Sequence, residues 1–344
     1  MMYAALVLAG TGTIILTSIA PSLVVNQIIW YVAGSIIFLV MRRVHPDVLL
    51  KFWWIKYVLS VALLIFVLLG PEVRGSHRWI FIGGYQFQPS EIVKPFILVS
   101  VAAYLSSLKS CTFKAFFGAT LLCAVPFTLI FEQPDLGNSI VYFFSFALMF
   151  ARSRFPKRYI LIPAAIALIA LPYGWHLLED YQKSRVTTFL NPEFDIQGAG
   201  YNARQSLIAV GSGGLWGKGL GQGTQSKLQF LPEYHTDFIF ASTVEQLGFV
   251  GGAVLLTVYF ILLNRITAIA VKGDEFSRLV ATGIFAQLFV QIGVNIGMNL
   301  GLVPITGITL PLVSFGGSSI IATAMSLAIV DIFRKDEHKS IAIR

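Results

Sequence analysis

The acidic and basic side chains that could carry out chemistry gather in a few short polar segments of this chain. Asp237 stands where a long polar segment meets an apolar run, two residues after His235, with Glu245 about two helical turns further on. Partial loss of water around such a carboxylate makes it a candidate general base. The alternative is an Asp that stabilises the first turn of a helix and has no chemical role. His235 is a weaker candidate, because a lone histidine at such a boundary is commonly a hydrogen-bonded surface residue.

A second polar segment combines charged and aromatic residues; it begins at Arg74 and includes Arg78 and Trp79. Glu91 and Lys94 stand three residues apart further along it, so that on a helix they share one face and can pair. Pro89 suits the first turn of that helix. The pair is either a structural contact that closes a helix end or a part of a substrate site.

Two carboxylates, Glu132 and Asp135, flank a proline in a third segment. Asp135 is well suited to cap the helix that follows it, and Lys94 is its alternative partner if the fold brings the two helix ends together. A fourth segment, 295–319, is rich in Asn, Gly, Ser, Thr and Pro and contains Ser318. Such a stretch must be buried in protein or line a cavity, because lipid cannot satisfy its polar groups.

About nine glycines fall within 198–223, and the run from Gly211 to Gly219 superficially resembles a phosphate-binding loop. It does not match one, because Ser212 stands where a glycine is required and Gly219 replaces the hydroxyl residue that would hold magnesium. Backbone amides freed by these glycines can still meet a diphosphate. We favour the other interpretation, in which the glycines allow a segment to pack closely.

The elements that position these residues must be membrane helices. The chain has 344 residues, of which 56% are hydrophobic and 12% charged, and its mean hydropathy is +0.75. This composition excludes soluble enzymes, secreted disulfide scaffolds and disordered regulators. The net charge of +8 does not indicate a nucleic-acid partner, because the Lys and Arg residues are dispersed in short clusters between apolar runs.

We expect an all-α polytopic membrane protein with about ten transmembrane helices, forming a single domain over 1–344. The apolar runs are approximately 3–20, 23–41, 52–70, 91–108, 115–131, 136–151, 158–178, 237–263, 279–299 and 312–333. Both termini are expected in the cytoplasm, because that orientation places most Lys and Arg of the short loops inside. The outer face then carries two large loops, 71–90 and 179–236. No cleavable signal peptide is evident.

The two cysteines are expected to be free thiols. Twelve residues separate Cys111 from Cys123. On a helix that separation is about 18 Å, too far for a disulfide.

Several motifs together resemble the SEDS family (shape, elongation, division and sporulation), the multispan polymerases of the bacterial cell wall. The motifs follow the family's order through nearly the whole chain: Arg78-Trp79-Ile80, Gln88-Pro89-Ser90-Glu91 with Lys94, Gln133-Pro134-Asp135-Leu136-Gly137, Gly211 to Gly221, Leu231 to Ala241, and Pro311 to Ser319. The segments 223–226 and 303–307 look most like the elongation branch, the RodA type. The division branch, the FtsW type, is the alternative. One departure is Gln246 after Glu245, where the family commonly has two adjacent acids.

The resemblance implies a peptidoglycan glycosyltransferase that polymerises lipid II, the undecaprenyl-pyrophosphate-linked disaccharide pentapeptide, on the outer leaflet of the bacterial cytoplasmic membrane. Asp237 would take the proton from the acceptor hydroxyl in an inverting, single displacement. Arg78 and Lys94 would stabilise the departing pyrophosphate, with a divalent cation, Mg²⁺ or Mn²⁺, as a potential helper. Glu91 and Asp135 would orient Lys94 or shape the groove. Trp79 would stack on a sugar or anchor at the lipid interface. His235 and Ser318 are the remaining expected site residues.

The resemblance also implies a partner, a class B penicillin-binding protein, which for the elongation branch is the transpeptidase of a rod-shape complex. A lipid II flippase or transporter is the main rival function, since many spans with charged residues in a groove also describe transporters. The polar candidates cluster on the outer face without a matching set at mid-membrane or inside, which favours the enzyme. A catalytically idle scaffold is the third possibility.

Overall fold

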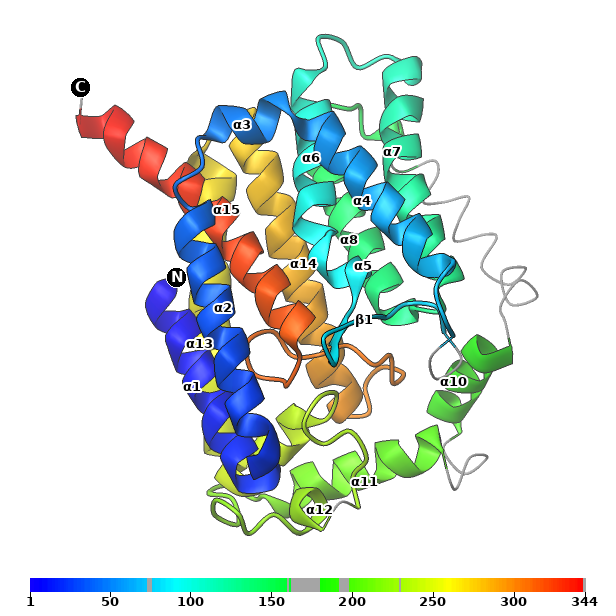
Figure 1. Cartoon of the computed structure of the whole chain (residues 1–344), viewed down its shortest axis with the longest axis vertical. Coiled ribbons are helices and arrows are strands. Elements are labelled where there is room, and N and C mark those ends of the chain that lie inside the picture. The colour runs from blue at the N-terminus through cyan, green and yellow to red at the C-terminus, as the bar shows by residue number, and fades with distance from the viewer. Residues whose placement is uncertain (73–75, 160, 162–179, 192–197, 229, 343–344) are drawn as a thin grey trace. The chain divides into compact units, whose positions relative to one another are not determined.

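Helices dominate the computed structural model, which describes residues 1–72, 76–159, 161, 180–191, 198–228 and 230–342 (Figure 1). The described elements are α1 (Met2–Ile19), the 3-10 helix η1 (Pro21–Leu23), α2 (Val24–Met41), α3 (Pro46–Lys51), α4 (Trp53–Leu68), β1 (Ile80–Ile82), β2 (Tyr85–Phe87), α5 (Pro89–Ile92), α6 (Lys94–Ser107), α7 (Phe113–Glu132), α8 (Leu136–Arg152), α10 (Asp180–Leu190), α11 (Ala199–Ser212), α12 (Thr224–Lys227), α13 (Ile239–Lys272), α14 (Glu275–Asn299) and α15 (Gly317–Ala342).

The chain forms two compact units, each built from three stretches of sequence. Unit 1 comprises Met1–Trp30, Leu168–Leu262 and Gln291–Gly316, and unit 2 comprises Tyr31–Ala167, Leu263–Val290 and Gly317–Arg344. Three of the boundaries between these stretches fall inside α2, α13 and α14.

Within the described ranges, six helices are long and apolar enough to cross a membrane: Met2–Ile19, Pro21–Met41, Phe113–Glu132, Ile239–Lys272, Glu275–Asn299 and Gly317–Arg334. Three shorter apolar helices are Trp53–Leu68, Lys94–Ser107 and Leu136–Arg152. Together these helices fall on every predicted apolar run except 158–178, most of which lies outside the described residues. The helical, multi-pass architecture is confirmed, while the count of ten spans stays a prediction.

In unit 2, α6 packs against α4, α7 and α8, which lie side by side in Figure 1. Ile97, Leu98 and Val99 of α6 are fully buried in this packing. The predicted run 91–108 is not one helix, since α5 ends at Ile92 and α6 begins at Lys94. Pro95 explains the break. Inside a continuous helix it would leave one backbone hydrogen bond unmade, whereas in the first turn of a new helix its missing N–H is not needed.

The expected outer loop 71–90 contains a β-hairpin in its second half. Strands β1 and β2 pair antiparallel, with Ile80 opposite Phe87. The turn consists of Gly83 and Gly84, whose φ angles of +59° and +83° suit the two-residue turns that require glycine. The hairpin leads directly into α5, and α15 packs against both β2 and α5.

The expected outer loop 179–236 contains three helices, α10, α11 and α12. Helix α11 packs against the other two. Ala209 of α11 is buried with Leu231 and Phe238, so the segment has a small apolar core of its own. Burial of that core explains why part of a polar, glycine-rich stretch is helical.

Helix α13 is broken at Gly248, in its unit 1 part, where φ of +70° and ψ of −171° are not helical. The glycine-rich segment fills the break: Phe249 N donates to Gly214 O at 2.8 Å and Val250 N to Leu215 O at 3.2 Å. A Cβ on Gly217 would overlap the carbonyl oxygen of Gln246. The close-packing interpretation is therefore confirmed at Gly217. The predicted span 237–263 falls on the long apolar helix α13, and the break at Gly248 is a feature that its hydropathy did not indicate.

Candidate functional site

Asp237 lies in a tight turn immediately before α13, two residues ahead of the first helical residue. The amides of Thr236, Asp237 and Phe238 all donate to the carbonyl oxygen of Glu233, at 3.1, 3.1 and 3.2 Å. Glu233 itself has a left-handed backbone, with φ of 49°. The expectation of an Asp in the first turn of the helix is corrected here, since the first turn of α13 contains no acidic residue. Asp237 is partly exposed.

The carbonyl groups of this turn are held by the segment that follows α14. Phe315 N donates to His235 O at 2.9 Å, and Ser314 Oγ donates to Thr236 O at 2.6 Å. Ser314 Oγ also accepts from Leu310 N at 2.8 Å. Helix α15 begins only at Gly317, because the residues predicted as its start form these turns instead.

The carbonyl oxygen of Asp237 accepts two side-chain hydrogen bonds from α14. Asn295 Nδ2 donates to it at 3.0 Å and Asn299 Nδ2 at 2.9 Å. Gly307 lies on the other side of Asp237, where a Cβ would come 3.6 Å from Oδ2. The structure therefore fixes the backbone that carries the carboxylate and leaves a glycine beside its oxygen.

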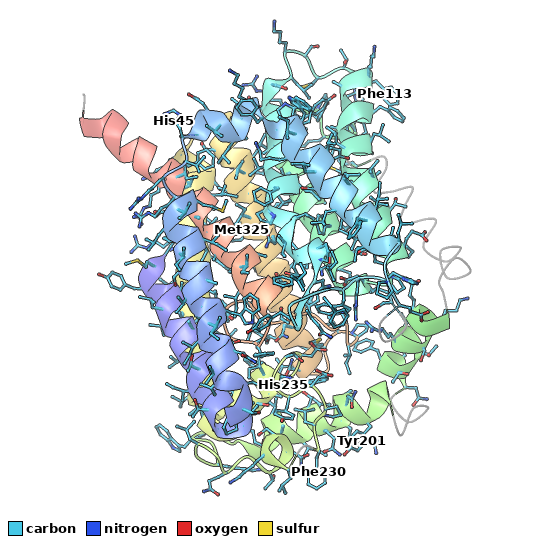
Figure 2. All side chains as sticks on the ribbon, in the orientation of Figure 1. His45, Phe113, Tyr201, Phe230, His235 and Met325 are labelled. Carbon is cyan, nitrogen blue, oxygen red and sulfur yellow. The ribbon has the colours of Figure 1, made fainter. Side chains whose placement is uncertain are left out.

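His235 is half-buried next to this turn (Figure 2). Its ring lies 5.1 Å from the ring of Tyr234 and 5.8 Å from that of Phe315, measured between centroids. Burial lowers the pKa of His235 below its ordinary value of 6.5, and the Glu233 carboxylate partly opposes that shift. A neutral imidazole can act as a hydrogen-bond donor and an acceptor. Nδ1 is buried and has no hydrogen-bond partner among the described residues.

Glu245, two turns into α13, binds the glycine-rich segment and is fully buried. Its carboxylate accepts from Lys218 Nζ at 3.1 Å, from Gln225 N at 2.9 Å and from both N and Oγ of Ser226 at 3.1 and 2.9 Å. A buried carboxylate needs this many donors. Glu245 therefore fixes the segment that leads into the Asp237 turn.

The other expected site residues lie in unit 2, where Asp135 is the centre of a buried network. Its side chain caps α8 by accepting from Asn138 N at 3.1 Å, so the capping interpretation is confirmed. Gln88 Nε2 and Ser90 Oγ donate to the same carboxylate at 2.6 and 3.3 Å. The basic residue beside it is Arg78, at 3.9 Å. The alternative pairing of Asp135 with Lys94 is therefore not the one observed.

Lys94 pairs with Glu91, as their spacing predicts, at 2.9 Å. The Lys94 side chain is 1% exposed and that of Glu91 is 6% exposed. Tyr142, also fully buried, donates from its hydroxyl to Ser90 O at 3.1 Å. Each charge of the pair thus offsets the cost of burying the other.

Trp79 and Ser318 complete the unit 2 group. The Arg78 guanidinium lies 5.8 Å from the Trp79 ring centroid, within the range of a cation–π contact. Ser318 is buried and its hydroxyl accepts from Gln88 N at 2.9 Å, which joins the start of α15 to the end of the hairpin. Unit 2 therefore contains six of the expected site residues, Arg78, Trp79, Glu91, Lys94, Asp135 and Ser318. Unit 1 contains the other two, Asp237 and His235.

The two asparagines that hold Asp237, Asn295 and Asn299, are functional residues that the sequence pattern did not single out from the polar stretch 295–319. Their spacing of four residues, which places two carboxamides on one face of an apolar helix, is the signal that could have identified them. The cysteines are free as expected, and within the described part of the chain no three His, Cys, Asp or Glu residues gather as a metal site would require.

Comparison with known proteins identifies relatives over most of the chain. The peptidoglycan glycosyltransferase MrdB of Escherichia coli K12 is 39% identical over 308 residues, covering 86% of this chain and 81% of that protein. A probable peptidoglycan glycosyltransferase FtsW of Nitrosomonas europaea is 37% identical over 298 residues, covering 81% and 75%.

Solved structures agree with this relationship. A chain from a peptidoglycan synthase complex that coordinates polymerization and crosslinking superposes with a TM-score of 0.86 at 31% identity, covering 98% of this chain and 97% of that one. The rod shape determining protein RodA of Thermus thermophilus gives a TM-score of 0.74 at 29% identity, covering 97% and 95%. Residues 2–339 match the cell cycle protein family of FtsW, RodA and SpoVE. The chain belongs to this family, the SEDS family that its motifs indicated.

Proposed function

We propose that this chain is a RodA-like peptidoglycan glycosyltransferase that polymerises lipid II into β-1,4 glycan strands on the outer leaflet of the bacterial cytoplasmic membrane. The names of its relatives support the reaction class, at 39% identity for the MrdB enzyme and 37% for the FtsW enzyme. The motifs at 223–226 and 303–307 favour a role in elongation over one in division.

The observation that carries the proposal is Asp237 itself, a partly exposed residue whose backbone is held by Asn295 and Asn299 and whose carboxylate lies beside Gly307. In the proposed reaction Asp237 accepts the proton of the acceptor's sugar 4-hydroxyl as that oxygen bonds to the anomeric carbon of the donor. The bond from that carbon to the pyrophosphate oxygen breaks, and the electron pair leaves with undecaprenyl pyrophosphate. A single displacement converts an α-linked donor into a β-linked product, so no second, nucleophilic carboxylate is needed.

The charge that grows on the leaving pyrophosphate requires a cation. Arg78 is our first candidate, because its side chain is 23% exposed and its Asp135 contact, at 3.9 Å, is loose. Lys94 is deeply buried against Glu91, which suits a residue that shapes the site through this ion pair.

The other unit 2 residues would bind the sugars or orient Arg78. Trp79, partly exposed beside Arg78, offers a flat apolar face on which a sugar ring can stack. Asp135 and Ser318 both bind Gln88 and so hold the hairpin end next to Arg78. In unit 1, the half-buried ring of His235, two residues before Asp237, would line the substrate site.

A Mg²⁺ or Mn²⁺ ion bound mainly by pyrophosphate oxygens would help to neutralise the leaving group. The carboxylates Glu91, Asp135 and Glu245 are not arranged as metal ligands. Glu91 and Glu245 each pair with a lysine, and Asp135 accepts four hydrogen bonds from Gln88, Ser90 and Asn138. We therefore assign no step to a metal ion.

The proposed partner is a class B penicillin-binding protein, the elongation transpeptidase, within a rod-shape complex. The similarity to a chain of a peptidoglycan synthase complex, with a TM-score of 0.86, supports an assembly of this kind. The partner would crosslink the strands that this chain polymerises.

The experiment is glycan polymerisation from labelled lipid II by the purified full-length chain with its class B partner, whose transpeptidase is inactivated. We expect polymer from the wild type and none from Asp237→Asn. The matched control is Asp47→Asn, which alters a carboxylate that is 83% exposed at the start of α3. Movement of lipid II across vesicle membranes without polymer would favour a flippase, and polymer from Asp237→Asn would remove Asp237 as the essential base.

A further inference from the structure

We infer that Asn295 and Asn299 are positioning residues that set the place of the Asp237 carboxylate through its backbone. This inference rests on the proposed function, in which Asp237 is the general base. Both side chains are uncharged, and the role proposed for them does not require contact with the substrate.

Asn299 replaces a hydrogen bond of the helix backbone. In a regular α-helix the N–H of residue 241 would donate to the C=O of residue 237. Here Ala241 N donates to Asn299 Oδ1 at 2.9 Å, while Asn299 Nδ2 donates to Asp237 O at 2.9 Å. The carboxamide is thus inserted between the two groups that would close a helical turn, and it keeps Asp237 in the turn that precedes α13.

Asn295 joins Asp237 to the segment that faces it. Its Nδ2 donates to Asp237 O at 3.0 Å and to Ile308 O at 2.6 Å. Ile308 adjoins Gly307, the residue beside the Asp237 carboxylate. One amide group therefore sets the separation between the backbone of the proposed base and the glycine next to its oxygen.

The two asparagines are themselves held firmly. Both are 0% exposed. Asn299 Nδ2 donates to Asn295 O at 2.7 Å, and Ser206 Oγ of α11 donates to Asn299 O at 2.9 Å. A buried network of this kind has few alternative arrangements, because each broken bond leaves a polar group without a partner.

Position matters for a general base because it must lie within hydrogen-bond reach of the proton it removes. A displacement of about 1 Å at a reacting group can cost on the order of 10²-fold in rate. Asp237 lies outside α13, so its place depends on these tertiary hydrogen bonds. Loss of either asparagine donor should therefore reduce turnover even though the carboxylate is still present.

The test compares Asn295→Ala, Asn299→Ala and Asn299→Asp with the wild-type chain, each with its class B partner. Asn299→Asp keeps the shape of the side chain and replaces the NH2 group that donates both hydrogen bonds. The matched control is Gln287→Ala, which deletes another buried carboxamide of α14 about two turns earlier, bonded to Ser326 Oγ at 3.3 Å. Each variant is also made in an Asp237→Glu chain, whose carboxylate is already displaced.

We expect the asparagine variants to lower kcat for lipid II polymerisation by roughly 10- to 100-fold with KM little changed, and Gln287→Ala to leave kcat within about 2-fold. In the Asp237→Glu chain the same asparagine changes should have a much smaller effect, because they act through the residue already altered. Hydrogen exchange of the backbone amides of residues 236–238 should accelerate in the asparagine variants and not in the control.

The inference would be overturned if the asparagine changes reduced activity equally in the wild-type and Asp237→Glu chains. It would also be overturned if Gln287→Ala lowered kcat as much as the asparagine variants do. Either result would indicate a general packing role. Full activity in all three asparagine variants would also overturn it. If the wild-type complex makes no polymer, the proposed function fails. Exchange at 236–238 then decides the inference by itself, and unchanged exchange in the asparagine variants would refute it.

Discussion

Gly307 lies directly beside the carboxylate of Asp237, where a Cβ would come 3.6 Å from Oδ2, and its φ is +74°. A side chain at this position would occupy space next to the proposed base, and the left-handed backbone would disfavour any residue other than glycine. The structure offers a matched position on the same segment. Gly301 has φ of +66°, and the three atoms nearest to its Cβ would belong to the side chain of Leu207.

We expect Gly307→Ala to lower polymerisation by up to about 10²-fold, because it places a methyl group in contact with the carboxylate and strains the turn that faces it. Gly301→Ala introduces a similar backbone strain, worth about 1–2 kcal/mol, away from Asp237. Polymer yield per folded protein, with thermal unfolding measured in parallel, separates the two effects. Equal activity of both variants would show that Gly307 serves the backbone alone.

Glu245 should be required for the order of the glycine-rich segment. Removing one partner of a buried ion pair typically costs about 3–5 kcal/mol, so Glu245→Ala should lower the unfolding temperature strongly and expose residues 214–228 to protease. Lys218→Ala should cost less, since Gln225 and Ser226 still donate to the carboxylate and Lys218 is 27% exposed. Limited proteolysis followed by mass spectrometry locates the cleavage. Protection of this segment in Glu245→Ala would contradict the prediction.

Local spacing explains which features the sequence could predict. The Glu91–Lys94 pair, the Asp135 cap and the start of α5 at Pro89 each depend on residues within one or two helical turns. Their outcome follows from rules that act along a single helix.

Contacts between distant segments explain what the sequence did not predict. The break at Gly248 exists because the loop around Gly214 supplies acceptors to Phe249 and Val250, more than thirty residues away. The place of Asp237 likewise depends on Asn295 and Asn299, 58 and 62 residues further along. Hydropathy alone indicates a continuous helix in the first case and an ordinary helix start in the second.

The Glu91–Lys94 pair provides a test that separates charge balance from function. Glu91→Gln and Lys94→Met should each destabilise the protein, because each leaves one buried charge without its partner. The double variant should recover much of the stability, since no unpaired charge remains. If the pair also supports the substrate site, polymerisation stays low in the folded double variant. Full activity of the double variant, measured against its unfolding temperature, would reduce the pair to a structural contact.

His235 should make the stability of the Asp237 turn depend on pH. Its pKa in the folded protein lies below the ordinary value of 6.5, chiefly because burial disfavours the charged ring. The unfolded chain therefore binds a proton more readily, and the free energy of unfolding should fall as pH is lowered through about 6.5 and below. Above that range His235 is neutral in both states and contributes no pH dependence. His235→Gln removes the titrating group and should flatten this part of the curve, which thermal unfolding between pH 5 and 8 would measure. A curve for His235→Gln that falls as steeply as that of the wild type would assign the pH dependence to other residues.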